Sequence, residues 1–155
     1  MIRAWRIDKA ARSKADSFSG EGGRLVAGRW NSKGQPVVYT ASTLSLAALE
    51  KFVHLGAEGA AIGFVSYEIE IPASVKTAEV KRSAVPRDWR EQPAPESTQK
   101  IGDEWIRGMK SAVLVVPSVV TPDEFNLLLN PAHPGFAKIK ISAPRAYSFD
   151  PRMWK

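Results

Sequence analysis

Residues 28–50, GRWNSKGQPVVYTASTLSLAALE, predict a turn, a strand and a helix in immediate succession. This unit carries Arg29 in its turn, Tyr39 on its strand and Glu50 on its helix. A guanidinium, a phenol and a carboxylate therefore come from one short stretch. Their closeness in sequence makes this unit the first candidate for a functional site.

The limits of the strand and the helix follow from local signals. PVVYTA, residues 36–41, is a short run of β-forming residues led by a proline. Ser42 or Thr43 can accept a hydrogen bond from a free amide of the first helical turn. The helix is expected to run to about Leu55, with Gly56 as a left-handed residue that ends it.

The flanking segments supply mainly strands. MIRAWRID, residues 1–8, alternates, and so does GFVSYEIEIP, residues 63–72. In the second of these runs the side chains expected to face inward are Val65, Tyr67, Ile69 and Ile71. SAVLVVPS, residues 111–118, is a continuous apolar run, typical of a strand covered on both faces.

The remaining segments are assigned as follows: a long Gly-rich loop at 17–36, an irregular excursion at 81–100, a helix at 98–110, one or two helical turns at 123–131, and strands at 138–142 and 145–150. Strands dominate without regular alternation of strand and helix. The pattern predicts an α+β fold in which two small β-sheets pack together with a few flanking helices. We expect residues 1–155 to form a single domain.

The composition restricts the class of protein. The chain has no cysteine, so disulfides and thiolate chemistry are excluded, and a reducing cytoplasmic location is expected. No apolar run approaches the roughly 20 residues that cross a bilayer. A net charge of +6 leaves nucleic acid open as a partner, but the basic residues are scattered among acidic ones. We expect no membrane and no direct nucleic-acid partner, and a non-catalytic nucleic-acid-binding module is the alternative of a different class.

Arg29 and Tyr39 each allow two interpretations. A planar guanidinium presented by a Gly-rich loop suits a phosphate or pyrophosphate, whereas an ordinary surface arginine would stack on Trp30 or pair with an acid. Tyr39 can offer an aromatic face to a flat heterocycle, or it can be a core tyrosine whose hydroxyl reaches one partner.

Glu50 and Ser118 are the other candidates. Glu50 lies beside Leu46 and Val53 on a helical wheel, at the border of the apolar stripe, where a carboxylate loses water unless a cation or donor compensates. The alternative is a glutamate that reaches solvent from the stripe's edge. Ser118 follows a buried strand and can point into a cleft, or can simply form a turn after Pro117.

Several familiar sites are absent from the sequence. The two histidines, His54 and His133, lie far apart and there is no cysteine, so a zinc site lacks ligands and no metal is expected. Phosphate-loop, dinucleotide-fold and serine-hydrolase motifs do not occur. Asn126, Asn130 and His133 are expected to cap and connect a turn.

The sequence resembles the RES-domain toxins of bacterial Xre–RES toxin–antitoxin systems along nearly its whole length. The matching segments are WRI (5–7), GRWNSKGQPVVYTA (28–41), SLAALEKFVHL (45–55), TQKIGDEWI (98–106), VPSVVTPDEFNLLLNPAHPGF (116–136) and FDPRMW (149–154). Ala27 and Lys33 depart from the commoner glycine and proline of the family, at positions without a catalytic role.

The resemblance implies an ADP-ribosyltransferase-like fold and an activity on NAD⁺. It implies Glu50, Arg29 and Tyr39 as catalytic residues, and Arg29, Tyr39 and Ser118 as substrate-binding residues. Cleavage of the nicotinamide–ribose bond by hydrolysis or phosphorolysis is the expected reaction, and ADP-ribosylation of a cellular protein is the alternative. The implied partner is an Xre-type antitoxin that occludes the active site.

Overall fold

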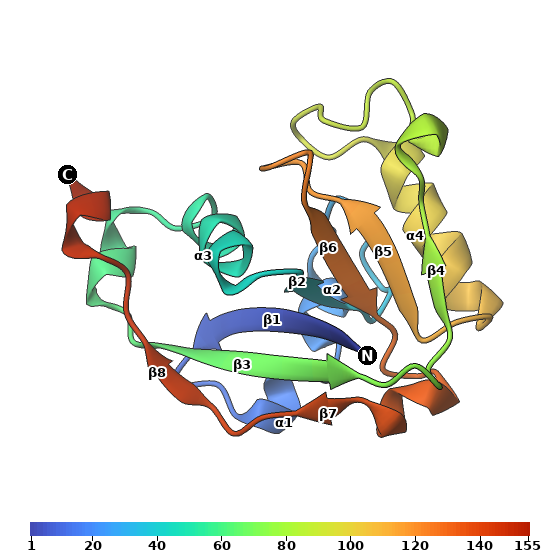
Figure 1. Cartoon of the computed structure of the whole chain (residues 1–155). Coiled ribbons are helices and arrows are strands. Elements are labelled where there is room, and N and C mark those ends of the chain that lie inside the picture. Colours follow the sequence, from blue (N-terminus) through green and yellow to red (C-terminus); the bar gives the residue numbers. More distant parts are fainter.

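A strongly curled sheet of eight strands organises the chain, and the computed structural model describes all 155 residues (Figure 1). The strand order is β4-β5-β6-β2-β1-β3-β7, and β8 pairs with β3 beside β7. All neighbouring strands are antiparallel except β4 and β5. The strands are β1 (Ile2–Lys9), β2 (Val38–Ala41), β3 (Phe64–Ile71), β4 (Thr77–Glu79), β5 (Val113–Pro117), β6 (Phe125–Leu129), β7 (Lys140–Ile141) and β8 (Arg145–Tyr147).

Helices flank this sheet on both sides. The α-helices are α1 (Lys14–Ser17), α2 (Glu21–Leu25), α3 (Leu44–Phe52) and α4 (Glu96–Gly108). Short 3-10 helices occupy Ala57–Ala61, Arg82–Ala84, Pro134–Lys138 and Pro151–Trp154. Helix α4 packs on β5 and β6, while α3 lies near the other half of the sheet (Figure 1). No helix combines the length and the apolar character that a membrane span needs.

The predicted α+β class is confirmed, but the two expected sheets are halves of one. Strands β1 and β2 are paired at a single position, Trp5 with Ala41. On one side of this junction lie β2, β6, β5 and β4, and on the other lie β1, β3, β7 and β8. Because so short a ladder leaves the two strands free to diverge, the halves turn away from each other and open a gap between them.

Strand β3 confirms the alternation expected for it, with one addition. Tyr67, Ile69 and Ile71 are buried in the main core, and Val65 is partly buried beside them. Phe64 and Ser66 on the opposite face are also buried. The C-terminal strand β8 pairs along this end of β3, and Phe149 packs edge-on against the Phe64 ring, so both faces are covered there.

The segment 123–131 was expected to form helical turns, and this prediction is wrong. Residues Phe125–Leu129 form β6, between β5 and β2. Leu127 and Leu129 enter the main core, while Leu128 faces the core under α4. A short apolar run buried on both faces fits a helix or a strand equally well, and only pairing with both neighbours decides between them.

Helix α3 begins as expected but ends early. Thr43 is the N-cap, and its hydroxyl accepts a hydrogen bond of 3.0 Å from the amide of Leu46. The helix stops at Phe52, and the chain continues in turns to Gly56, whose φ of −88° is not left-handed. Gly56 is therefore not the helix-ending residue that the sequence suggested. The expected loop at 17–36 is likewise interrupted by α2.

Candidate active site

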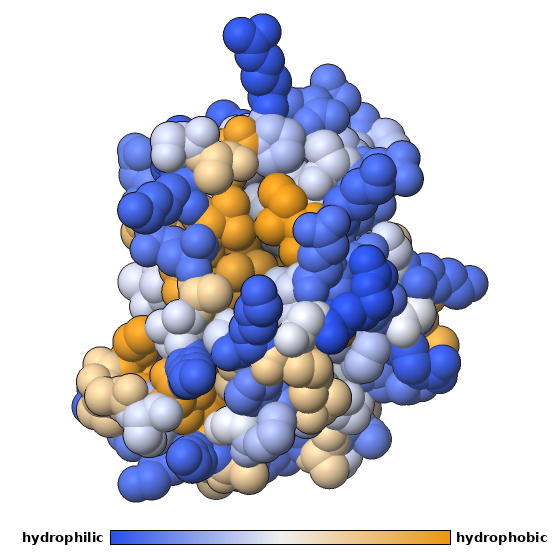
Figure 2. Space-filling model, turned by 90° about the vertical axis from the view of Figure 1, so that its right-hand side faces the viewer, coloured by the Kyte–Doolittle hydropathy of each residue, from blue (hydrophilic) through white to orange (hydrophobic).

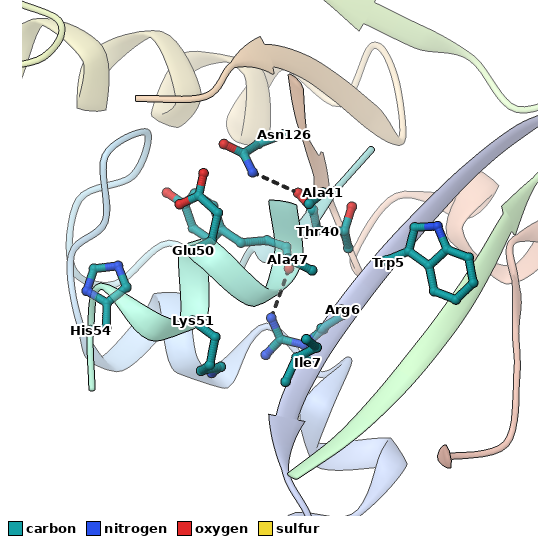
Figure 3. A pocket seen from close by; sticks show the side chains of 11 residues that line it. Trp5, Arg6, Ile7, Thr40, Ala41, Ala47, Glu50, Lys51, His54 and Asn126 are labelled. Carbon is teal, nitrogen blue, oxygen red and sulfur yellow. Dashed lines mark hydrogen bonds between the residues drawn. The ribbon is translucent and has the colours of Figure 1, made fainter. Parts of the chain in front are cut away.

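A cleft opens where β1 and β2 diverge, and α3 forms its opposite wall (Figure 3). Its volume is about 160 Å³, smaller than the roughly 300–1,000 Å³ of pockets that enclose a whole drug-sized ligand. It is lined by Trp5, Arg6 and Ile7 of β1, Tyr39, Thr40 and Ala41 of β2, Ala47, Glu50 and Lys51 of α3, His54 and Asn126. Strand, helix and loop thus meet at the break in the sheet.

Glu50 is held in this cleft by Ser118. The Ser118 hydroxyl donates a hydrogen bond of 2.7 Å to Oε1 of Glu50, and its oxygen accepts from the amides of Val120 and Thr121, each at 3.1 Å. Ser118 is fully buried, so its effect on the cleft passes through Glu50. No arginine or lysine forms an ion pair with Glu50. The carboxylate is oriented by a neutral donor and has no cation within ion-pair distance.

Tyr39 lies in the cleft wall with its hydroxyl directed away into the Gly-rich loop. That hydroxyl donates to Oδ1 of Asn31 at 2.6 Å and accepts from the amide of Trp30 at 3.0 Å. Burial raises the pKa of Tyr39 well above that of a free phenol, so the hydroxyl stays neutral. The hydroxyl of Tyr39 thus anchors residues 28–31 against β2. The rest of the residue lines the cleft.

Arg29 extends from the same loop, next to the cleft. Its Nη1 donates to the backbone carbonyls of Trp89, at 3.2 Å, and of Glu91. Burial lowers the pKa of the guanidinium, and Tyr39 and Glu50 offset part of this effect, which places all three groups in one electrostatic neighbourhood. Arg29 does not line the cavity itself. One edge of the guanidinium is fixed by carbonyls, while Nε is buried without a partner.

Helix α4 fixes the backbone of the Arg29 loop. Thr98 Oγ1 donates to the carbonyl of Arg29 at 2.6 Å. One turn further along the helix, Asp103 accepts from the amide of Ser32 at 2.8 Å and from its hydroxyl at 2.5 Å. Gly102 lies between these contacts, and a Cβ there would overlap the carbonyl oxygen of Trp30. The glycine that interrupts the helical pattern is what lets α4 approach the loop.

Two buried arginine nitrogens have no hydrogen-bond partner. Among buried side-chain nitrogen and oxygen atoms, only Nε of Arg6 and Nε of Arg29 lack a partner. Arg6 Nη1 donates to the carbonyl of Tyr39 at 2.9 Å, so the two guanidiniums flank this tyrosine. Because buried donors are almost always paired, these two unpaired guanidinium nitrogens set Arg6 and Arg29 apart from the other polar groups of the interior.

Comparison with known families decides the relationship. A family model described as the RES domain matches residues 3–150. The chain belongs to the RES-domain family. The prediction from the sequence motifs is confirmed.

Curated relatives of this RES domain are toxins by name. It is 42% identical to the Prs ADP-ribosylating toxin of Sphingobium sp. (strain YBL2), over 96% of this chain and 94% of that protein. It is 40% identical to a protein named Toxin Res from Yersinia enterocolitica, over 92% of this chain and 93% of the relative. Among solved structures, a chain of the M. tuberculosis MbcT–MbcA toxin–antitoxin complex superposes with a TM-score of 0.71 over 99% of this RES domain and 86% of that chain. At 19% identity, this last likeness shows the shared fold.

The structure adds cleft residues that sequence reasoning missed. Arg6 and Lys51 line the cavity, and both approach the buried carboxylate of Asp8, at 3.3 Å and 4.0 Å. Arg6 lies mid-strand on the side opposite Trp5, a position where a charged residue needs a reason. That signal was visible in the sequence, but the partner of Arg6 was not.

Two further cleft residues were not predicted as such. Asn126 was expected to cap a turn, and His54 was given no role. His54 follows Glu50 by one turn and lines the cleft of this RES domain (Figure 3). Asn126 does not cap a turn: it lies on β6, lines the cleft and donates to the carbonyl of Thr40 at 3.3 Å. Asn130 does accept from the amide of Ala132. His133 accepts from the amide of Gly135, so for these two the capping prediction is confirmed.

A second hollow of about 560 Å³ lies between β4 and α4, and Figure 2 views the molecule from this side. Apolar side chains form patches there among hydrophilic ones (Figure 2). Buried polar groups that line this hollow hydrogen-bond to each other. For example, the Trp105 indole donates to Ser111 at 2.8 Å. It offers no converging set of unpaired polar groups, so the smaller cleft is the better active-site candidate. No group of three or more histidine, aspartate or glutamate side chains is arranged to hold a metal ion.

Proposed function

We propose that this RES domain is the toxin component of a toxin–antitoxin system and that it consumes NAD⁺ by cleaving the nicotinamide–ribose bond. One observation carries the proposal: a serine-oriented glutamate lies in a cleft beside two arginines whose buried Nε atoms have no partner. NAD⁺ needs a carboxylate near its ribose and cations for its diphosphate. The names of the curated relatives support this assignment.

Glu50 would stabilise the charge that develops during bond cleavage. When the C1′–N bond breaks, its electron pair moves to the pyridinium nitrogen, and the positive charge passes from the ring to the ribose. An uncompensated carboxylate nearby favours this oxocarbenium-like state over the ground state. Nicotinamide leaves as a neutral molecule, so the leaving group requires no general acid. Water or phosphate then adds to C1′.

Arg6 and Arg29 would bind the diphosphate. A guanidinium can offer two parallel N–H groups to one phosphate. Arg29 donates to carbonyls through Nη1 alone, whereas Arg6 uses both Nη atoms, on the Tyr39 carbonyl and on Asp8, and Nε of each arginine is unpaired. The cavity of about 160 Å³ has room for only part of a dinucleotide. The nicotinamide end would therefore occupy the cleft, and the rest would extend past the Arg29 loop.

Tyr39 and Ser118 take supporting roles in this proposal. Tyr39 holds the loop that presents Arg29, and its ring can contact the nicotinamide end of the substrate. Ser118 orients Glu50 and is a positioning residue, rather than a direct substrate ligand as the family resemblance implied.

The test is an assay of free nicotinamide released from NAD⁺ by the purified protein, with and without inorganic phosphate. Glu50→Gln keeps the size of the side chain but removes its charge, and should lower the rate by about 100-fold or more. Glu79→Gln, at an exposed position on β4, is the matched control and should leave the rate unchanged. No nicotinamide release by the wild-type protein under either condition would refute the proposal.

Transfer of ADP-ribose to a protein is the second candidate. It is favoured by the name of the Sphingobium relative, an ADP-ribosylating toxin that is 42% identical to this chain. The same cleft chemistry would serve, with a protein side chain as nucleophile. In a cell lysate with labelled NAD⁺, a discrete labelled protein band supports transfer, whereas soluble labelled products alone support degradation.

An antitoxin of the Xre type would complete the system by covering the cleft. The fold shared with a chain from a toxin–antitoxin complex supports such a partner. Leu49 and Val53, next to Glu50 and His54 along α3 and its end, are exposed and would offer an apolar contact. Co-expression with the product of a neighbouring helix-turn-helix gene should relieve toxicity and yield a stable complex. Substituting both residues with serine should weaken that complex.

A further inference from the structure

Asp8 is a buried carboxylate to which the proposed reaction assigns no role. It lies at the end of β1 and is only 1% exposed. Ser17 Oγ donates to its Oδ2 at 2.5 Å, and the amide of Lys9 donates to its Oδ1 at 2.8 Å. The fold therefore encloses this carboxylate and supplies it with hydrogen-bond donors.

Cations surround this carboxylate on its remaining sides. Arg6 and Arg12 each approach Oδ2 at 3.3 Å, and the ammonium of Lys51 lies 4.0 Å from Oδ1. Burial would raise the pKa of Asp8, but Arg6, the hydrogen bonds from Ser17 and Lys9, and Lys51 outweigh it and lower the pKa. Asp8 therefore stays ionised, as one negative charge facing three positive ones.

Two of the three cations also line the active-site cleft. Arg6 and Lys51 reach it from β1 and α3, on either side of the gap in the sheet (Figure 3). Arg12 is the most exposed of the three and does not line the cleft. Arg6 donates through one Nη to the carbonyl of Tyr39 and through the other to Asp8, and its buried Nε has no hydrogen-bond partner.

We propose that Asp8 is a positioning residue that holds Arg6 and Lys51 together as one binding site for a phosphoryl oxyanion. The inference rests on the proposed function, since it names the group that anchors the phosphate of the substrate. Asp8 fixes the direction of the Arg6 guanidinium. It also draws Lys51 across the gap, and thereby ties the helix that carries Glu50 to β1.

The charge of Lys51 depends on the same contact. Burial lowers the pKa of Lys51, and Arg6, Arg12 and Lys9 lower it further. Asp8 is the one group facing Lys51 that raises its pKa. Without the Asp8 charge, Lys51 would lose its proton at lower pH and the site would lose part of its attraction for an anion.

The phosphoryl group can come from two sources, and the test separates them. One is the diphosphate of NAD⁺, and the other is free inorganic phosphate that attacks the ribose. If the site holds the diphosphate, Asp8→Asn raises the KM for NAD⁺. If it holds free phosphate, the same variant raises the KM for phosphate in the phosphate-dependent reaction and leaves that for NAD⁺ unchanged.

The decisive experiment compares Asp8→Asn with the wild-type full chain. Loss of one charge-assisted contact should raise the relevant KM by about tenfold, with kcat changed less than about threefold. The alkaline limb of the pH profile for kcat/KM should shift to lower pH. Glu68→Gln is the matched control, because that carboxylate pairs with Arg3 and Arg145 on another part of the sheet.

A binding measurement keeps the inference separate from the catalytic proposal. Titration calorimetry with ADP-ribose, which cannot release nicotinamide, should show weaker binding to Asp8→Asn if the diphosphate occupies the site. Failure of the wild-type protein to release nicotinamide overturns the proposed function. Wild-type activity, with KM values and a pH profile that Asp8→Asn leaves unchanged, overturns the role of Asp8 alone.

Two further variants cover a failure of Asp8→Asn to fold. Ser17→Ala removes a donor to Asp8 without changing any charge, and should raise the same KM by a smaller factor. Lys51→Met removes the cation itself, so it should raise the same KM and abolish the alkaline limb that the lysine causes. An alkaline limb that persists unchanged in Lys51→Met would show that the site does not depend on the lysine charge, and would overturn that part of the inference.

Discussion

Ser118 and Glu50 meet across 68 positions of sequence, joined by a hydrogen bond of 2.7 Å between the hydroxyl and Oε1. Ser118 follows the end of β5, and Glu50 lies on α3, on the far side of β6 and β2. The bond fixes a carboxylate that no cation neutralises. The end of β5 and helix α3 thereby cooperate in presenting one carboxylate to the cleft.

Ser118→Ala should reduce kcat for NAD⁺ consumption by about 10- to 100-fold, the effect of losing one hydrogen bond to a charged group. KM should change little, since Ser118 is buried behind Glu50. The matched control is Ser74→Ala, at an exposed position without side-chain hydrogen bonds, which should behave as wild type. A kcat that is unchanged in Ser118→Ala would contradict the positioning role.

Arg29→Lys should raise the KM for NAD⁺ by at least about tenfold, although the positive charge is kept. The guanidinium donates through Nη1 to two carbonyls and still has an unpaired Nε, whereas a lysine ammonium has no second edge to offer. Steady-state kinetics measure the effect. Arg87→Lys, an exposed substitution in the neighbouring segment, serves as control. Equal KM values for the two variants would argue against bidentate binding by Arg29.

Gly102→Ala should both destabilise the protein and impair catalysis. A Cβ at this position would overlap the carbonyl oxygen of Trp30, so either α4 or the Arg29 loop must move. We expect a loss of about 1–3 kcal/mol in the free energy of unfolding. Gly108→Ala, at the last position of the same helix with open space around it, should be neutral or slightly stabilising. Urea unfolding and the nicotinamide assay measure both effects.

Asp8 should make stability depend on pH in the acid range. Its pKa is lowered in the folded protein, so its stabilising contribution is complete above the unfolded value of about 4 and is lost as pH falls through the folded value. The wild-type advantage in unfolding free energy over Asp8→Asn should therefore be largest near neutral pH and shrink below about pH 4. Urea unfolding between neutral and acid pH would show a constant difference if Asp8 were not ionised and paired.

Local patterns predicted the elements that have one dominant periodicity. The alternation around Tyr67 and Ile69 identified β3, and the N-cap Thr43 marked the start of α3. The same reasoning failed for Phe125–Leu129, because a run buried on both faces carries no periodicity. The same reasoning placed the end of α3 at Gly56, whereas the helix ends at Phe52.

The residues of the candidate site also divide into those that the sequence predicted and those that only the structure revealed. Arg29, Tyr39 and Glu50 stood out because they crowd one short stretch, and family motifs pointed to them. The structure adds their partners: the Tyr39 hydroxyl donates to Asn31, and the Ser118 hydroxyl donates to Glu50. Asp8, Arg6 and Lys51 gave no joint signal, since their association depends on where β1 and α3 lie relative to each other.

By itself the sequence determined which face is buried in the elements with one clear period, such as β3, because there burial repeats with the period of the local backbone. It also determined the family, through motifs in a constant order. Only the tertiary structure decided that two sheets are one, joined at Trp5 and Ala41, and that the break between them forms the cleft. Strand order and the partners of charged groups depend on contacts between distant segments, and no local period encodes them.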